Sequence, residues 1–553
     1  MTCIVYPGAL HTRLLHSLGT LYVCAEMINT CNRNAEIYSR LAPPDHPIPV
    51  YIHSYAIVLA RICALLHDLA HVPFGHTFEK EARIFEKDEW QDPWRDEKLL
   101  GPSSGLAKRL REFFHHENPS LPSEAVDHLR EDVRKVFKTK RETVHTLQYP
   151  FVHDLVGNTI CADLIDYVKR DMYFCGLTER FGDRFLQYLA VFPVQGTFQT
   201  KEGKHEIHEW KPFRVTNKND AFPTACEDKD TIKTCRVVLM NYRYNERHEA
   251  VGKHGVFEES IDLVRRRLSV AEKLYFHRTK VTASAMLGEA ARVANLKAED
   301  IWDKSDVEVL KYLENNKDQR VSVLAKKVLK RQLFKPIYRV NYHPKDDSTT
   351  YKDVIKAYER FKNPTERGTL SERLERLIGL TQQHPEDAKG TVVISCPDYD
   401  MSLKAFDMLV MAEPGEIIKK LQVSEHPPTK EEIKAIQDTH KYLWRLEVFV
   451  DPKVKRNDKF TQRLAGAIQL EIGPKNVVKE FEGVPGIDIN ELEAELRLNS
   501  FLKIIGIEPD ELRQGDRKEL ELLAHRSDYE CLDQQHGEAI KNKLREKGYK
   551  IPQ

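Results

Sequence analysis

The residues best suited to chemistry follow a short apolar run. Residues 57–66, IVLARICALL, are predicted to form a helix that is buried on most of its surface. The run ends in His67-Asp68, and three more polar side chains follow within twelve residues: His71, His76 and Glu79. A buried imidazole beside an ionised carboxylate is costly unless the two pair or hold a cation. Because imidazole and carboxylate together suit Mn, Fe, Zn, Co or Ni, the sequence predicts a divalent-metal site here.

Further metal ligands are expected from other parts of the chain. Adjacent residues point about 100° apart on a helix, so His67 and Asp68 reach one ion together only at a helix end or from different directions. Upstream, residues 6–20, YPGALHTRLLHSLGT, place two histidines and an arginine among apolar residues. Downstream, residues 161–171, CADLIDYVKRD, hold three aspartates. Both segments are therefore candidate sources of the remaining ligands.

The order of these residues resembles the HD phosphohydrolase superfamily, whose signature of H, then HD, then D reads here as His16, His67-Asp68 and Asp163. The flanking motifs PGAxHTRxxHSLGT, HDLAHxPFGHxxE and DxxDYxxRD are more specific. Together they resemble the deoxynucleoside triphosphate triphosphohydrolases, the dGTPase and dNTPase branch. The resemblance implies that these four residues bind a divalent metal (Mn, Fe, Zn or Mg), whereas the bland alternative is ordinary buried hydrogen bonding.

The same resemblance implies catalytic roles for His71, His76, Glu79 and His116. His76 and Glu79 are three residues apart, so the carboxylate can orient the imidazole if both lie on one helical turn. With His71, the pair would serve the attack of water at the α-phosphorus or the protonation of the departing nucleoside oxygen. The alternative for the pair is a surface contact. His116, in FFHHE, matches a further active-site histidine of the family.

Five more residues match substrate-binding positions of the family. Arg13 and Arg267 would hold the triphosphate, because guanidinium groups suit phosphate oxygens; in the triple-arginine run, a solvated helix face is the alternative for Arg267. Tyr167 and Asp171 match positions that pack on and hydrogen-bond the deoxyribose. Tyr275 matches a tyrosine beneath the sugar, where a 2'-hydroxyl would clash. For these aromatic side chains the alternative is core packing.

Regulation and base preference are less transferable. Arg331 and Lys335, in KRQLFK, match basic residues that bind an activating nucleotide at a subunit junction in relatives, although a basic helix end also complements the helix dipole. Leu164 and Phe276 stand where vertebrate members carry lysine and glutamine. We therefore expect this chain to share the family's cleavage chemistry, but we do not extend to it the family's phosphate contacts or base preference.

The resemblance begins close to Met1, where relatives usually have more chain and vertebrate members a SAM domain. In relatives this preceding chain helps to bind the base. Either the start is truncated, or another part of the chain or another subunit makes those contacts.

Composition excludes some classes of protein. The 553 residues carry 85 basic and 85 acidic side chains, so no global field favours nucleic acid or membranes. No stretch reaches the roughly 18 to 20 consecutive apolar residues that span a bilayer. The ten cysteines are scattered without a CxxC pair, which is typical of reduced thiols. We therefore expect a soluble protein of the cytoplasm or nucleus.

The elements expected to position these residues are mainly helical. We expect a mainly α fold: an HD-domain helical core over residues 1–340 with a strand-bearing insertion at about 195–250, an α+β region over 341–488, and a helical tail over 489–553.

The sequence thus predicts an enzyme that cleaves 2'-deoxynucleoside triphosphates to deoxynucleoside and inorganic triphosphate. The resemblance further implies control of dNTP pools, with a role in DNA metabolism or antiviral defence, a homo-oligomer (dimer, tetramer or hexamer) and an activating nucleotide. One alternative is an HD-type phosphodiesterase or nuclease acting on cyclic nucleotides or single-stranded nucleic acid. Another is a nucleotide-sensing protein without turnover.

Overall fold

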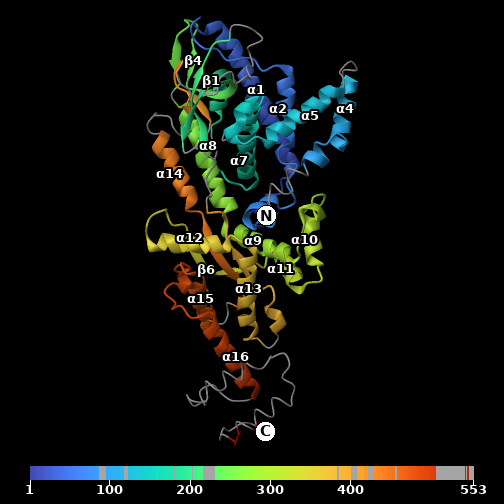
Figure 1. Cartoon of the computed structure of the whole chain (residues 1–553), viewed down its shortest axis with the longest axis vertical. Helices are drawn as coiled ribbons and strands as arrows, with labels where there is room; N and C mark the ends of the chain where they lie inside the picture. The colour runs from blue at the N-terminus through green and yellow to red at the C-terminus, as the bar shows by residue number, and fades with distance from the viewer. Residues whose placement is uncertain are drawn as a thin grey trace. The chain divides into compact units, whose positions relative to one another are not determined.

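The chain divides into two compact units, which we describe from a computed structural model (Figure 1). The first unit comprises Met1–Val72, Glu86–His277 and Asp400–Lys441, and the second comprises Pro73–Phe85, Arg278–Tyr399 and Tyr442–Gln553. The structure describes residues 1–85, 95–117, 123–158, 160–178, 182–201, 204–215, 231–253, 255–382, 385–399, 408–416, 419–420, 429–454, 458–505, 542 and 545–546.

The first unit is built on a long helix, α1 (Arg13–Leu41), which packs against α2 (Ser54–Leu66) and α7 (Ala162–Phe174). The Thr12 side chain caps α1 by accepting the Leu15 N–H at 3.3 Å. Buried side chains three to four residues apart on α1, such as Cys24, Ile28 and Cys31, face the core. The remaining helices are α4 (Gly105–Glu117), α5 (Ser123–Lys138), α6 (Pro150–Gly157), α8 (Val256–Val270) and α14 (Thr429–Lys441), with short turns η1 (Thr2–Ile4), η3 (Arg95–Leu99), η4 (Arg141–Thr146), η5 (Arg184–Tyr188) and η7 (Ala271–Tyr275).

A sheet belongs to the first unit, in the order β2-β1-β3-β8-β9. Its strands are β1 (Leu189–Lys201), β2 (Lys204–Pro212), β3 (Thr231–Met240), β8 (Leu409–Met411) and β9 (Lys419–Lys420), and β4 (Tyr242–Tyr244) pairs separately with β5 (Ala250–Gly252). Strands β1 and β3 are antiparallel, with Val191 opposite Val237, whereas β3 and β8 are parallel. The strand-bearing insertion expected near 195–250 is therefore present.

The second unit is α+β. A three-stranded antiparallel sheet has the order β6-β10-β7, formed by β6 (Lys335–Asn341), β10 (Arg445–Val450) and β7 (Val392–Ser395). Its helices are α9 (Arg278–Val293), α10 (Asp306–Glu314), α11 (Gln319–Leu329), α12 (Thr349–Phe361), α13 (Pro364–Gly379), α15 (Asp458–Ile472) and α16 (Ile489–Ile505), with short turns η2 (Thr77–Glu81), η8 (Ala298–Asp300), η9 (Pro385–Ala388) and η12 (Lys479–Phe481). Helices α9 and α13 both pack against β7.

The expected fold class is confirmed, because a mainly helical structure carries the predicted sheets. The largely apolar stretch 150–178 predicts a single helix, but the structure has two helices there, α6 and α7. The break follows Gly157, where Asn158 donates from its side chain to Asp154 at 3.2 Å. Most of the tail beyond Ile505 lies outside the described residues. Among the described helices, none is both long and apolar enough to cross a membrane.

Candidate metal centre

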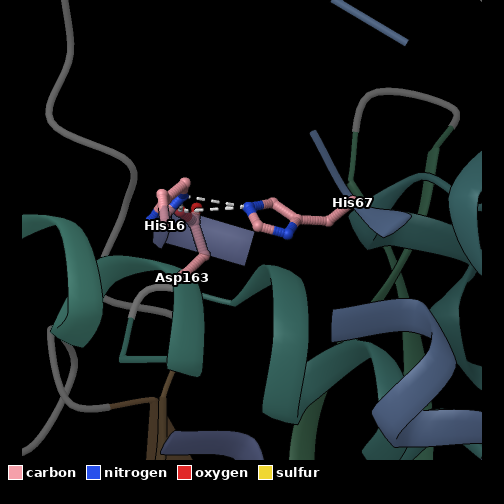
Figure 2. Close-up of side chains that lie close together, drawn as sticks. All are labelled: His16, His67 and Asp163. Carbon is pink, nitrogen blue, oxygen red and sulfur yellow. Dashed lines mark hydrogen bonds and ion pairs between the residues drawn. The ribbon is translucent and has the colours of Figure 1, made fainter. Parts of the chain in front are cut away.

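Three helices of the first unit bring candidate ligands together. His16 lies in the first turn of α1, His67 directly follows the last turn of α2, and Asp163 lies in the first turn of α7. Because α1 packs against both α2 and α7, these positions converge. Figure 2 shows the three side chains pointing toward one another.

The ligand atoms of the three residues form a tight cluster. His16 Nε2 lies 3.2 Å from Asp163 Oδ1 and 3.2 Å from His67 Nε2, and His67 Nε2 lies 3.5 Å from Asp163 Oδ1 (Figure 2). The two imidazole rings meet edge to face, with centroids 5.0 Å apart. Two ring nitrogens and a carboxylate oxygen thus face one small volume.

Asp68 extends the cluster. Its carboxylate oxygens lie 3.9 Å from His16 Nε2 and 3.8 Å from His67 Nε2. The Asp68 carboxylate also lies 3.5 Å from His71 Nε2, so the predicted catalytic His71 adjoins the predicted ligands. Since α2 has ended before His67, neighbouring side chains at 67 and 68 are free to approach one volume, as the sequence required.

Hydrogen bonds at the outer ring nitrogens orient both ligand imidazoles. His67 Nδ1 lies 2.8 Å from the Ala64 carbonyl oxygen, and His16 Nδ1 lies 2.7 Å from Asp166 Oδ2. Each of these oxygens accepts a hydrogen bond from the Nδ1–H group, which leaves the Nε2 lone pair of the neutral ring facing the other ligands. This is the tautomer that a metal ligand needs.

The cluster fits a divalent ion. Metal–nitrogen and metal–oxygen bonds of about 2.0–2.2 Å place neighbouring ligand atoms roughly 3.0–3.5 Å apart in octahedral or tetrahedral geometry. The separations among His16, His67 and Asp163 fall in that range. Two imidazoles with carboxylates suit Mn, Fe or Zn and do not select among them.

The cluster is also electrostatically prepared for a cation. Burial opposes charge on Asp163, but hydrogen bonds from His16 and His67 hold its pKa far below the usual range. Burial lowers the pKa of His16, yet hydrogen bonds to Asp163 and Asp166 outweigh it and raise the pKa to about 10. A proton on His16 Nε2 occupies the position that a metal would take, so proton and metal compete for the same lone pair.

Three of the five predicted substrate residues lie together beside this cluster. Tyr167 and Asp171 follow Asp163 at spacings of four and eight along α7, so all three share one helix face. The Tyr275 hydroxyl donates to Asp171 Oδ2, and its ring centroid lies 6.4 Å from that of Tyr167. Burial raises the pKa of Tyr275 well above its usual value, and Asp171 and Tyr167 raise it further, which keeps the hydroxyl a donor.

The two predicted triphosphate arginines occupy different settings. Arg13 is exposed at the start of α1 and donates to the His71 carbonyl at 2.7 Å, so it adjoins the metal cluster. Arg267 is half-buried near the end of α8, and its charge acts on the Tyr167 hydroxyl. Both guanidinium groups therefore lie beside residues already placed at the site.

For the remaining predicted residues, the structure shows mainly the helix, turn or strand to which each belongs. His76 precedes η2 and Glu79 lies within it, both in the second unit, with ligand atoms within 4.8 Å of one another. His116 is exposed in the last turn of α4. Arg331 follows α11 with a φ of +55°, and Lys335 begins β6; both are exposed in the second unit. Their roles stay predictions.

Two contacts at the site had no assigned role in the sequence. His11 Nε2 lies 2.7 Å from Asp171 Oδ1 and its ring lies 4.8 Å from that of Phe174, so His11 holds the carboxylate predicted to bind sugar. Asp166 contacts His16. The three-residue spacing from Asp163 to Asp166 places both on one side of α7 and was a usable signal; nothing in the sequence links His11 to Asp171.

The chain is similar to several known proteins. Residues 13–171 match the HD domain family, a range that contains all four predicted ligands. The chain is 26% identical over 211 residues to the deoxynucleoside triphosphate triphosphohydrolase SAMHD1 of Danio rerio, covering 35% of this chain and 31% of that protein. An uncharacterized protein of Methanocaldococcus jannaschii is 35% identical over 199 residues, covering 35% of this chain and 31% of that protein. The match thus spans about a third of each relative.

A solved structure is also similar. The crystal structure of a phosphohydrolase from Bacteroides thetaiotaomicron aligns with a TM-score of 0.45 at 17% identity, covering 81% of this chain and 90% of that chain. The HD domain match and the relatives at about 25% identity support an HD-domain phosphohydrolase that binds a divalent metal.

Proposed function

We propose that the protein hydrolyses 2'-deoxynucleoside triphosphates to deoxynucleoside and inorganic triphosphate and thereby controls dNTP pools. The observation that carries this proposal is the position of two groups on α7. Asp163 faces the two imidazoles, and Asp171 with Tyr275 forms a hydrogen-bonded pair two turns further along the same face. The printed name of the Danio rerio relative, a deoxynucleoside triphosphate triphosphohydrolase, supports the same substrate class.

Different residues of the site would bind the metal and the phosphate groups. His16, His67, Asp68 and Asp163 would hold the metal, which would polarise the α-phosphate and lower the pKa of a bound water. Arg13 would contact phosphate oxygens, because it is exposed and anchored beside the ligands through the His71 carbonyl.

The sugar end depends on a fixed carboxylate. Asp171 accepts from His11 at one oxygen and from Tyr275 at the other, so its orientation is set before substrate arrives. An oxygen of this carboxylate still has a lone pair for a sugar hydroxyl. The Tyr275 ring, held by the same contact, would lie beneath the sugar and disfavour a 2'-hydroxyl.

Acid–base chemistry falls to His71, His76, Glu79 and His116. His71 contacts the Asp68 carboxylate at 3.5 Å, so its ring can take or give a proton close to the metal ligands. Glu79, within η2, would orient His76, which directly precedes η2. We further propose that the protein forms a homo-oligomer and that Arg331 and Lys335 bind an activating nucleotide.

Chromatography of products tests the reaction. The purified chain is incubated with Mn²⁺ or Mg²⁺ and each of the four dNTPs, singly and mixed, beside the four rNTPs. Deoxynucleoside and intact triphosphate are expected in equal amounts from dNTPs and not from rNTPs. Release of monophosphate or diphosphate products would contradict the proposed bond cleavage. Absence of turnover, followed by cleavage of cyclic nucleotides or single-stranded nucleic acid, would replace the proposed substrate class.

Size-exclusion chromatography tests the partners. A larger assembly in the presence of a nucleotide, lost in an Arg331→Ala/Lys335→Ala variant, is expected. An assembly that is the same with and without each nucleotide, in both proteins, would remove regulation from the proposal.

A further inference from the structure

Asp166 has no part in the proposed reaction, yet His16 and Arg170 both contact its carboxylate. It is buried, with a side chain 8% exposed. Its Oδ2 atom lies 2.7 Å from His16 Nδ1 and accepts from Arg170 Nε at 2.9 Å, while Oδ1 accepts from the Arg170 terminal nitrogen at 2.8 Å. The Thr20 hydroxyl also lies near His16 Nδ1, at 3.5 Å.

We propose that Asp166, fixed by Arg170 and accommodated by Gly19, is the positioning residue that directs His16 Nε2 toward the metal. The inference rests on the metal site of the proposed function. It assigns Asp166 no contact with substrate or metal, because its oxygens face His16 Nδ1 and Arg170. The geometry makes His16 the middle member of a carboxylate, histidine and metal series, in which the outer partner sets ring orientation and tautomer.

Gly19 supplies an independent observation. A Cβ atom added at Gly19 would lie 1.9 Å from Asp166 Oδ1 and 2.2 Å from a terminal nitrogen of Arg170. Glycine inside a helix costs about 1 kcal/mol relative to alanine, and Gly19 lies inside α1. The close approach of the Asp166–Arg170 pair accounts for glycine at this position.

The two acceptor oxygens of the Asp166 carboxylate select the tautomer of His16. An asparagine offers one oxygen to the three donors that a carboxylate accepts. If that oxygen faces Arg170, the amide group donates to His16 Nδ1, and the ring then carries its proton on Nε2, where it cannot bind metal. If the oxygen faces His16, the amide group opposes an Arg170 donor. Asp166→Asn should therefore impair metal binding, and removal of the competing donor by Arg170→Met should restore part of it.

Mn²⁺ titration with detection of free Mn²⁺ by electron paramagnetic resonance tests the inference in the full chain. We expect Asp166→Asn to weaken Mn²⁺ binding about 10- to 100-fold, the range found for outer partners of metal ligands, and Gly19→Ala to weaken it in the same direction by displacing Asp166. The Asp166→Asn/Arg170→Met variant should bind more tightly than Asp166→Asn alone. A purely structural pair would not be rescued by a second substitution that removes its other member.

Two matched controls exist in the same unit. Asp154 forms a buried bidentate pair with Arg236, with both contacts at 2.7 Å, so Asp154→Asn should lower the melting temperature without changing Mn²⁺ affinity. Gly105, at the start of α4, has no heavy atom within 4 Å of an added Cβ, so Gly105→Ala should change neither quantity. If Asp166→Asn fails to fold, Gly19→Ala carries the test.

The outcomes separate this inference from the proposed function. Unchanged Mn²⁺ affinity in Asp166→Asn and Gly19→Ala overturns the inference alone. A wild-type chain that binds Mn²⁺ and loses affinity in both variants, but does not cleave dNTPs, supports the inference and removes the proposed substrate. A wild-type chain that binds neither Mn²⁺ nor Zn²⁺ overturns both.

Discussion

Removal of one ligand imidazole is the most direct perturbation of the metal centre. In His67→Ala the chain loses the Nε2 atom that lies 3.2 Å from His16 Nε2 and 3.5 Å from Asp163 Oδ1. The rest of the cluster has other supports, because His16 keeps its contact with Asp166 at 2.7 Å. The variant should therefore keep its fold and lose a ligand.

The expected magnitude follows from two comparisons. Loss of an outer partner of a metal ligand typically costs 10- to 100-fold in affinity, so loss of the ligand itself should cost at least about 100-fold. This corresponds to about 2.8 kcal/mol of binding free energy. In wild type, metal at about 100 times its dissociation constant should stabilise the fold by about 2.7 kcal/mol. That metal-dependent stabilisation should largely vanish in His67→Ala.

Calorimetric titration and thermal unfolding with and without Mn²⁺ measure both quantities. His46→Ala is the matched control, since His46 is a half-buried histidine of the same unit that contacts the Tyr244 hydroxyl at 2.7 Å. The control should keep metal affinity and the metal-dependent rise in melting temperature. Wild-type stoichiometry and affinity in His67→Ala would refute the ligand assignment.

Three further predictions concern other groups. Glu79→Ala should slow dNTP turnover and leave metal content nearly intact, measured by kinetics and elemental analysis, because Glu79 is predicted to orient His76. Tyr275→Ala should lower the dATP-over-ATP preference in kcat/KM about tenfold, because the ring predicted beneath the sugar is removed. Burial raises the pKa of Glu375 in the second unit from 4.5 to about 7, although Arg320 opposes the shift. The unfolded carboxyl ionises first, so stability should fall by about 3 kcal/mol as pH rises from about 4.5 to 7, and Glu375→Gln should abolish this slope. Hydrogen exchange in β7 measures it, since the Val392 N–H donates to Glu375 at 3.1 Å.

Each of these three has a contrary outcome. Loss of metal in Glu79→Ala would make Glu79 a ligand. An unchanged dATP-over-ATP ratio in Tyr275→Ala would return that residue to core packing. Exchange of the Val392 amide that slows with rising pH, after correction for intrinsic rates, would mean that Glu375 is already ionised in the folded chain.

Much of the fold followed from the sequence because the signals are local. The apolar run before His67 predicted a buried helix, and α2 ends at Leu66, directly before the His-Asp pair. Alternating apolar and polar residues, separated by turn-forming residues, predicted the strands of the insertion, which begin with β1 at Leu189. The limits expected for the domains remain predictions, since helix and strand periodicity carries no information about which segments cluster. The grouping of residues 73–85 with 278–399 depends on tertiary contacts.

The sequence predicted which residues form the site better than it predicted the hydrogen bonds between them. The order of His16, His67-Asp68 and Asp163 along the chain identified the residues that the structure brings together. The contact between His11 and Asp171 joins residues 160 positions apart, and the one between His16 and Asp166 joins residues 150 apart. No local pattern encodes such pairings, because they depend on how helices cross.

The two ligand histidines use different hydrogen-bond acceptors for Nδ1, because they lie at different positions relative to their helices. The last four carbonyls of a helix have no N–H partner within the helix. His67 follows the end of α2, so it finds a ready acceptor in the Ala64 carbonyl of the last turn. His16 lies inside α1, where the nearby carbonyl oxygens already accept hydrogen bonds from N–H groups of the same helix. The acceptor for His16 Nδ1 is therefore a side chain from another helix, Asp166. A histidine that follows a helix end can thus use a carbonyl of that helix as its acceptor, whereas His16, within a helix, uses Asp166, which Arg170 holds.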